Sequence, residues 1–416
     1  MSIGDVFWML LFLVIAATSV ALSLRVFYQW LTPISMYVGM NAISMAFYHL
    51  RLVPMTDVSL ETHALLLLSM FMFLTGVMLA LGGRSPTLQS LTGNVRDVRH
   101  LDTFFYGTAA LATIGWMLAS SILISRYGLP SLIQNIWVLQ IEFQMQFIGY
   151  LNMIGILVLP TYAIKRGLGR GRRRDVVLVG LTVFGLLLAG IKTYIMVSVI
   201  GAGLAWGACR PGRFKPYNLG LGLAALLVFF VVYNRNIDVY MPEAVDESRA
   251  ESSISILDRP YLYFVGSWPA TEALVAGEMG RLPLPGSITF EPAWKILGSG
   301  LKLVEPLPLS LPFTNIGITE FNVYSFVGEM FWDWGWIGAM IASGMFGYVA
   351  TRLYLRAMRA RYWGNVLIYA VFGYGIFLSS FMYYYRFNLM LQLGYTYFVG
   401  FVILRGGVIL DRRRHV

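Results

Sequence analysis

Two carboxylates stand one helical turn apart in the stretch "FNVYSFVGEMFWDWGWIGAM" at 321–340, just before a long uncharged run begins. If 322–350 forms one helix, the spacing places Asn322, Glu329 and Asp333 on one face. An acid at the edge of a bilayer is costly, and such a position can raise the pKa of a carboxyl group. Glu329 and Asp333 are therefore candidates for a general base or for acids that orient a hydroxyl group. The alternative is that both reach water or pair with Arg or Lys.

Three basic residues are candidates for binding an anion near these acids. Lys192 lies in the tight turn of "LLAGIKTYIMVSVI", and Arg386 lies in the short turn "YYYRFN" at 383–388. Arg259, in "LDRPYLYF", precedes a short apolar run. The planar guanidinium of Arg can bind two phosphate oxygens at once, whereas Lys acts as a point charge. The alternative for each residue is an ordinary charge that reaches water from the end of a span.

Few residues can bind a metal ion. The chain has no HExxH, CxxC, P-loop or GxSxG motif, and its single cysteine, Cys209, excludes an intrachain disulfide. Asp57 and Glu61 in "MTDVSLETH" are the remaining candidates for a divalent cation, but we favour a site with no metal and no cofactor. His49 and His63 flank the first external loop and can meet in space; we interpret them as boundary histidines with satisfied hydrogen bonds.

The elements that position these residues are membrane helices. The chain has 416 residues, of which 57% are hydrophobic and only 12% are charged, whereas soluble domains carry about 25% charged residues. Runs of about 20 apolar residues mark transmembrane helices. They predict an all-α polytopic membrane protein with eleven spans, give or take one, near 4–24, 27–50, 63–82, 103–124, 147–164, 176–191, 193–209, 218–233, 331–351, 364–382 and 389–409.

The distribution of Lys and Arg predicts the orientation. If alternate loops and the C-terminal tail share one side, that side holds 21 of the 31 basic residues and 4 of the 21 acidic ones. The positive-inside rule makes that side cytoplasmic. The N-terminus is then outside and the C-terminus inside, and "MSIGDVF" lacks the basic start of a cleaved signal peptide. Because the basic residues occupy short loops beside spans, we expect no nucleic-acid partner.

One external connection is much longer than the others. The prediction divides the chain into an N-terminal bundle of about eight spans at 1–233, an extracytoplasmic loop at 234–321, and a C-terminal part of about three spans with a basic tail at 322–416. The apolar run at 257–274 is too short to cross a bilayer and is expected to pack on the bundle or lie at the interface. A further amphipathic piece is expected around 292–303. A loop of this length in a compact protein is usually functional.

Three stretches resemble the Wzy-type oligosaccharide repeat-unit polymerases of bacterial surface polysaccharide synthesis. The stretch "NVYSFVGEMFWDWGWIGAMIASGMFGYV" is similar to the family pattern N-x-Y-[ST]-F … D-x-G-x-[IV]-G. The stretch at 187–200 is similar to a turn that usually reads G-S-R, with Lys192 where Arg is commoner. The stretch "YFVGSWPATEAL" occupies the place of a Y-x-x-G motif. The residues of the first pattern that match are Asn322, Tyr324, Ser325, Phe326, Asp333, Gly335 and Gly338.

The resemblance implies a metal-independent glycosyltransferase with a GT-C-like fold, which acts at the outer face of the bacterial inner membrane. Donor and acceptor would both be oligosaccharides on undecaprenyl diphosphate, and the growing chain would move onto a sugar hydroxyl group of the next unit. Glu329 or Asp333 would then be the catalytic base. The expected diphosphate-binding residues are Lys192, Arg259 and Arg386. The expected substrate-binding residues are Asn322, Tyr324, Arg281, Trp268 and Tyr384. The bilayer, a chain-length regulator and a flippase are the other implied partners.

Three other functions remain open at the level of sequence. An O-antigen ligase would use lipid A core as the acceptor, although the long loop has no His to assist it. A transporter or flippase of a lipid-linked saccharide would place charges at mid-membrane, whereas most charges here lie at span ends. A membrane acyltransferase typically needs a buried catalytic His.

Overall fold

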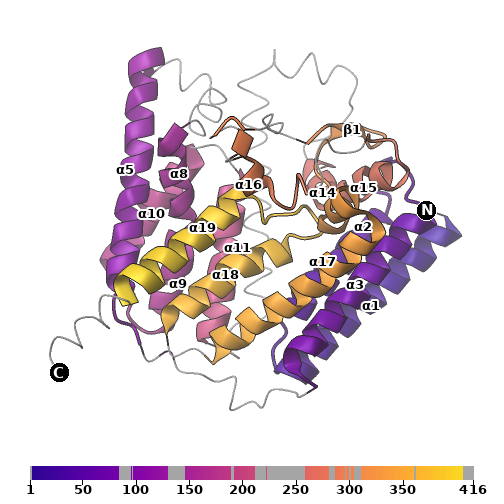
Figure 1. Cartoon of the computed structure of the whole chain (residues 1–416), viewed down its shortest axis with the longest axis horizontal. Helices are drawn as coiled ribbons and strands as arrows, with labels where there is room; N and C mark the ends of the chain where they lie inside the picture. Colours follow the sequence, from indigo (N-terminus) through magenta and orange to yellow (C-terminus); the bar gives the residue numbers. More distant parts are fainter. Residues whose placement is uncertain are drawn as a thin grey trace. The chain divides into compact units, whose positions relative to one another are not determined.

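A computed structural model of the chain consists mainly of α-helices (Figure 1). The described residues are 2–83, 95, 97–129, 146–188, 192–210, 222, 258–280, 286–295, 297–298, 301–303, 311–359 and 362–405. Within them, β1 (Thr314–Asn315) and β2 (Glu320–Phe321) form a two-stranded antiparallel sheet. The chain is thus predominantly helical, as the apolar runs predict.

Two compact units make up the chain. The first comprises Met1–Leu91, Ser252–Leu355 and Gly375–Met390, and the second comprises Thr92–Glu251, Arg356–Tyr374 and Leu391–Val416. Both candidate carboxylates, together with Arg259 and Arg386, belong to the first unit, whereas Lys192 belongs to the second. The predicted division at 233 and 321 stays a prediction.

Among the described residues, three helices are long and apolar enough to cross a membrane. They are α1 (Ile3–Phe27), α3 (Leu60–Leu81) and α5 (Leu101–Tyr127). Ser2 and Asp5 form a capping box at the start of α1, and the Ser59 side chain accepts a hydrogen bond from the Thr62 backbone N–H at the start of α3. Both caps satisfy backbone N–H groups that a helix start leaves open. Apolar helices of this length indicate a membrane protein.

Helices also occupy most of the other predicted spans. In the first unit these are η1 (Ser35–Gly39), α2 (Met40–Tyr48) and all but the last three residues of α17 (Phe326–Met358). In the second unit they are α8 (Gln146–Ile154), η2 (Gly155–Leu157), α9 (Val158–Gly167), α10 (Arg173–Leu188) and α11 (Lys192–Cys209). The chain continues through α18 (Trp363–Phe377), α19 (Phe387–Tyr397) and η4 (Phe398–Arg405). The predicted span at 218–233 lies almost entirely outside the described residues, so the count of eleven stays a prediction.

Helix α17 packs against α3 with its backbone in close contact. A Cβ atom on Gly347 would lie 2.1 Å from the Phe73 carbonyl oxygen, and one on Gly76 would lie 1.9 Å from the Gly344 carbonyl oxygen. Ala339 and Ser343 are fully buried on the same face. Small residues allow such an approach between membrane helices. The predicted stripe of small residues is therefore a packing surface, and α17 is a central helix of the first unit.

The prediction of one uninterrupted helix over 322–350 is wrong at two points. The helix begins at Phe326, because the Ser325 hydroxyl accepts a hydrogen bond from the Gly328 backbone N–H at 3.2 Å and caps the helix start. Asn322 precedes this cap and does not share a helical face with the acids. A second interruption falls at Gly335, whose φ of 66° and ψ of −166° are not helical. Glu329 and Asp333 lie together on the short segment between the cap and this break.

The middle of the predicted external loop packs on the helices. Helices α14 (Asp258–Val265) and α15 (Ser267–Val275) run through the apolar stretch at 257–274. The Ser44 hydroxyl on α2 donates to the Phe264 carbonyl oxygen at 2.6 Å and accepts from the Trp268 indole at 2.9 Å. This confirms that the stretch packs on the bundle. Within the amphipathic piece expected around 292–303, α16 covers Glu291–Lys295, while residues 296 and 299–300 lie outside the described residues.

A buried lysine joins three helices of the second unit. Lys165 has a fully buried side chain, and its ammonium group lies 2.7 Å from Asp102 and 2.9 Å from Asp175. It also lies over the rings of Phe105 and Tyr106, at 4.4 and 4.5 Å. The sequence assigns Lys165 to a basic loop. The fold instead makes it a buried counter-ion, because a charge leaves water only where opposite charges meet it.

Candidate functional site

A buried ion pair joins the first candidate acid to a candidate cation. One Nη of Arg386 donates to Glu329 Oε2 at 2.6 Å, and the Tyr383 backbone N–H donates to Glu329 Oε1 at 3.3 Å. The Glu329 side chain is fully buried, and that of Arg386 is 22% exposed. A charge-assisted contact of this length is among the stronger hydrogen bonds in proteins. The two residues lie 57 positions apart and form one polar unit.

Hydrogen bonds at the start of α17 place Glu329. The Phe326 backbone N–H donates to the Ser379 carbonyl oxygen at 2.8 Å, which ties the helix start to the turn after α18. The hydroxyl groups of Thr271, on α15, and Ser325 lie 2.9 Å apart, and the Ser325 backbone N–H donates to the Thr271 hydroxyl at 3.2 Å. Ser325, Thr271 and Ser379 thus provide polar groups that hold the start of α17. The site is therefore held from α15, α17 and the turn after α18.

The second candidate acid is held by a different segment. Asp333 Oδ2 accepts from the backbone N–H of Thr289 at 2.9 Å and from its hydroxyl group at 2.6 Å. The Thr289 hydroxyl in turn accepts from the Trp334 indole at 2.9 Å. The side chain of Tyr383 links the two acids, because its hydroxyl group donates to the Thr289 carbonyl oxygen at 3.4 Å. Glu329 and Asp333 thus belong to one network, which Thr289 and Tyr383 connect.

The surroundings of Glu329 favour its protonated form. Burial raises the pKa of Glu329, which precedes the predicted span at 331–351, to about 7, and Arg386 opposes this rise. Glu291, at the start of α16, adds a further carboxylate that acts electrostatically on both residues. A carboxyl group with such a pKa changes its protonation near neutral pH, which is the range in which a functional acid is useful.

Two polar atoms of the network have no hydrogen-bond partner among the described residues. They are Asp333 Oδ1 and Arg386 Nε, and both are buried. Buried polar atoms are nearly always paired, so an exception calls for an explanation. Both atoms are enclosed by protein, so a ligand that offers a hydroxyl group and an anionic oxygen can reach them only after neighbouring side chains move.

The other candidate cations do not join this network through the contacts described. Arg259 lies on α14, one turn before Tyr263, on which it acts electrostatically. Lys192 is the first residue of α11, in the second unit, and its side chain lies outside the described residues. Arg281 also lies outside them. The prediction that Lys192, Arg259 and Arg386 bind one diphosphate therefore stays a prediction.

Two of the predicted sugar-binding aromatic residues are buried. Trp268 is fully buried against Ser44, and Tyr324 is fully buried, with its hydroxyl group donating to the Pro312 carbonyl oxygen at 2.7 Å. Neither ring is open to a sugar in this conformation, because each fills a packed position of the first unit. Tyr384 is partly exposed in the turn before Arg386, and Asn322 is partly exposed before α17. These two stay candidates for substrate binding.

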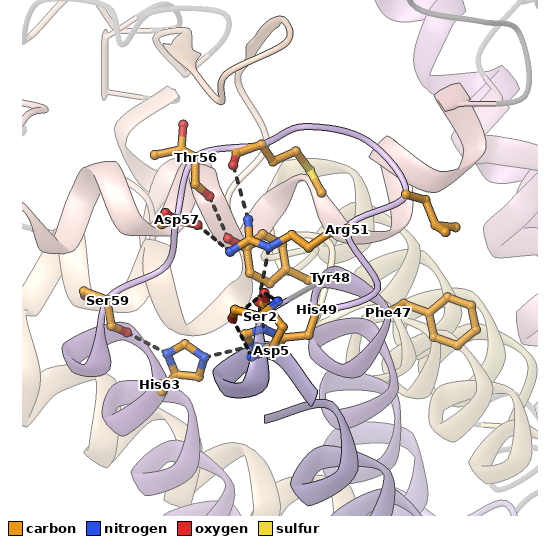
Figure 2. A network of polar contacts seen from close by, with 12 residues as sticks. Ser2, Asp5, Phe47, Tyr48, His49, Arg51, Thr56, Asp57, Ser59 and His63 are labelled. Atoms are coloured by element: carbon orange, nitrogen blue, oxygen red, sulfur yellow. Dashed lines mark hydrogen bonds and ion pairs between the residues drawn. The ribbon is translucent and has the colours of Figure 1, made fainter. Parts of the chain in front are cut away.

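A second polar network gathers around the loop between α2 and α3 (Figure 2). Arg51 donates to Asp57 at 2.5 Å and to Asp5 at 3.3 Å, so the Asp57 carboxylate is engaged by a cation already present in the chain. Among the described residues, no group of three or more His, Cys, Asp or Glu is placed to bind a metal ion. His49 and His63, which we interpret from the sequence as two boundary histidines, contact each other in the structure: their Nε2 atoms lie 3.0 Å apart.

Sequence reasoning missed the residues that support the acids. Thr289 carries no motif and lies 44 positions from Asp333, so only the folded chain brings the two together. Ser325 does leave a signal, since a serine directly before an apolar helical run is a typical helix start. That signal alone would have placed the beginning of the helix after Asn322.

No family model, no curated protein and no solved structure matches the chain. The apolar helices indicate a membrane protein. Its first unit contains a buried acid–guanidinium pair beside a second acid.

Proposed function

We propose that this protein polymerises oligosaccharide repeat units carried on undecaprenyl diphosphate, as its resemblance to the Wzy-type polymerases implies. The observation that carries the proposal is the Glu329–Arg386 pair at 2.6 Å, with Asp333 in the same network. Transfer of a glycan from a lipid diphosphate needs a cation for the leaving group and a base for the attacking hydroxyl group. This network contains both.

Each residue has a distinct part in the proposed reaction. The acceptor sugar hydroxyl attacks the anomeric carbon of the donor, a new C–O bond forms, and the bond from that carbon to the diphosphate oxygen breaks. The proton of the hydroxyl group passes to Asp333, whose Oδ1 has no hydrogen-bond partner among the described residues. Arg386 stabilises the charge that grows on the leaving oxygen. Glu329 holds Arg386 in position.

The proposal includes a topology and a set of partners. The protein would have about eleven spans, a GT-C-like arrangement, a periplasmic N-terminus and a cytoplasmic C-terminus. Its active site would face the periplasm of a bacterial inner membrane, where a flippase delivers the lipid-linked units and a chain-length regulator limits the polymer. The basic residues near one membrane face support this orientation.

A complementation experiment tests the proposal. In a strain that lacks the chromosomal copy, Arg386→Ala should abolish long polymer on a ladder gel while single capped repeat units persist. Arg352→Ala is the matched control, because Arg352 is exposed on α17 and outside the network. A normal ladder with Arg386→Ala would reject the assignment. Loss of the single capped units in the deletion strain would instead favour transport of the lipid-linked unit.

A further inference from the structure

His49 and His63 form a contact whose hydrogen bonds need more protons than two neutral rings supply. The chain of contacts runs from Asp5 Oδ1 to His49 Nδ1 at 3.1 Å, from His49 Nε2 to His63 Nε2 at 3.0 Å, and from His63 Nδ1 to the Ser59 carbonyl oxygen at 2.6 Å. Figure 2 shows His63 between Ser59 and His49, with Asp5 next to His49. All three distances are those of hydrogen bonds, so each contact needs one hydrogen atom.

The hydrogens at the two ends belong to the rings. The Ser59 carbonyl oxygen can only accept, so His63 Nδ1 must donate. Asp5 also accepts hydrogen bonds from Arg51, at 3.3 Å, and from the backbone N–H and hydroxyl group of Ser2, at 2.9 and 2.8 Å. A carboxylate that accepts this many bonds remains ionised, so His49 Nδ1 must donate as well. Both Nε2 atoms would then face each other as lone pairs unless one more proton lies between them.

We infer that His49 and His63 together bind a single additional proton, shared between their Nε2 atoms, and that this proton fastens α1 to the ends of α2 and α3. A neutral imidazole carries one N–H, so two rings with three hydrogens carry one positive charge. Asp5 supplies the balancing negative charge. Asp5 lies on α1, His49 directly follows α2, and His63 lies on α3.

Burial opposes a positive charge on both rings, so a single shared charge needs neighbouring groups that stabilise it. His63 stacks on Trp8 with ring centroids 4.2 Å apart, which favours a cation over the indole face. Glu272 on α15 accepts hydrogen bonds from Ser59 and Thr62 at 2.8 Å and acts electrostatically on His63. The positive charge of Arg51 opposes a second positive charge on either histidine. Arg51 is itself paired with Asp5 and Asp57. The ring of Tyr48 packs edge-on against His49.

A metal ion fits this geometry less well than a proton. Zinc binds imidazole nitrogens at 2.0–2.1 Å in a tetrahedral arrangement, which separates two ligand nitrogens by about 3.3 Å. The observed 3.0 Å is shorter and matches an N–H···N hydrogen bond. Among the described residues, no third His, Cys, Asp or Glu completes a metal site at the pair.

The shared proton predicts that the stability of this region passes through a maximum with pH. Two exposed histidines lose their protons near pH 6.5. Well below that pH the unfolded chain holds two protons where the folded pair holds one, so stability rises with pH. Well above it the unfolded chain holds none and the folded pair still holds one, so stability falls with pH. The unfolding equilibrium constant changes up to about tenfold per pH unit on each side.

Thermal unfolding of the purified full-length protein in detergent, from pH 5 to pH 8.5, tests the inference. The difference in Tm between the native chain and His63→Gln should be largest near pH 6.5 and shrink on both sides. Asp5→Asn keeps an acceptor for His49 but removes the counter-ion, so the alkaline limb should move down by about one pH unit or more. His100→Asn is the matched control, since His100 lies at the start of α5 in the second unit, and it should leave the profile unchanged.

A spectroscopic measurement keeps the inference testable if His63→Gln does not fold. In the native chain labelled with ¹⁵N-histidine, both Nδ1 atoms of the pair should carry a proton at pH 6.5, and the two Nε2 atoms should share one. Two neutral rings at that pH, or a Tm profile for His63→Gln parallel to the native one, would overturn the inference. Stoichiometric zinc in the purified protein, lost in His49→Gln, would also overturn it, because the bridging cation would then be a metal ion.

Discussion

The ion pair between Glu329 and Arg386 lies in a buried position. Taking two charges out of water is costly, and their attraction repays that cost only when the geometry is good. Here the contact is short and the Tyr383 backbone N–H satisfies the second carboxylate oxygen. Removing one partner leaves the other buried without compensation.

A double-mutant cycle separates stability from activity at this pair. We expect Glu329→Gln to lower the free energy of unfolding by about 3 kcal/mol, because the guanidinium loses its ionised partner. The double variant Glu329→Gln/Arg386→Met should recover much of that loss and still make no long polymer. Thermal unfolding and ladder gels on the same preparations provide both measurements. Polymer from the double variant would show that neither charge takes part in the reaction.

The protonation of Glu329 makes a pH dependence predictable. Burial raises its pKa to about 7, so below that pH the carboxyl group is protonated and no longer holds Arg386 by charge. Activity of the purified enzyme should therefore fall as pH decreases through about 7. Glu329→Gln should have low activity without this acid limb. Glu278→Gln, at an exposed position, should retain the limb at full activity; a limb that persists in Glu329→Gln would have another origin.

Helix α17 consists of two segments, one on each side of Gly335. Its first segment, from the Ser325 cap to Gly335, holds both acids, and its second segment packs closely on α3. The break at Gly335 needs a backbone conformation that glycine adopts without strain. The same helix thus separates the polar network from the apolar packing surface.

Two glycines on α17 provide a matched test of this packing. A Cβ on Gly347 would lie 2.1 Å from the Phe73 carbonyl oxygen, whereas one on Gly344 would lie 3.4 Å from the Met72 carbonyl oxygen. Gly347→Ala should lower the free energy of unfolding by about 1–3 kcal/mol, because the two backbones must separate. Gly344→Ala should be neutral or slightly stabilising, since alanine favours the helix. Equal effects of the two substitutions in thermal unfolding would argue against backbone contact.

For the whole molecule, the asymmetry of basic residues predicts an orientation in the membrane. Reporter fusions at 165–174 and at 240–250 should report opposite sides, with the first in the cytoplasm, because 165–174 is densely basic. A pair of reporters, one active only when exported and one only in the cytoplasm, would check this. The same side for both positions would contradict the span count between them.

The amino-acid sequence alone indicated a helical membrane protein and the approximate positions of most of the described helices. Long apolar runs have no stable alternative to a helix in a bilayer, because every backbone N–H and C=O group must be paired within the segment. It also singled out Glu329, Asp333 and Arg386, because charges beside apolar runs are rare.

The tertiary structure decided which of these residues meet. Glu329 pairs with Arg386, Asp333 binds Thr289, Lys165 is buried between two acids, and His49 meets His63. Each contact joins residues that are distant along the chain or on different helices, and its energy depends on burial and geometry rather than on local sequence. The prediction of one helix over 322–350 placed Asn322 beside the acids because it overlooked the local cap signal at Ser325 and the break at Gly335.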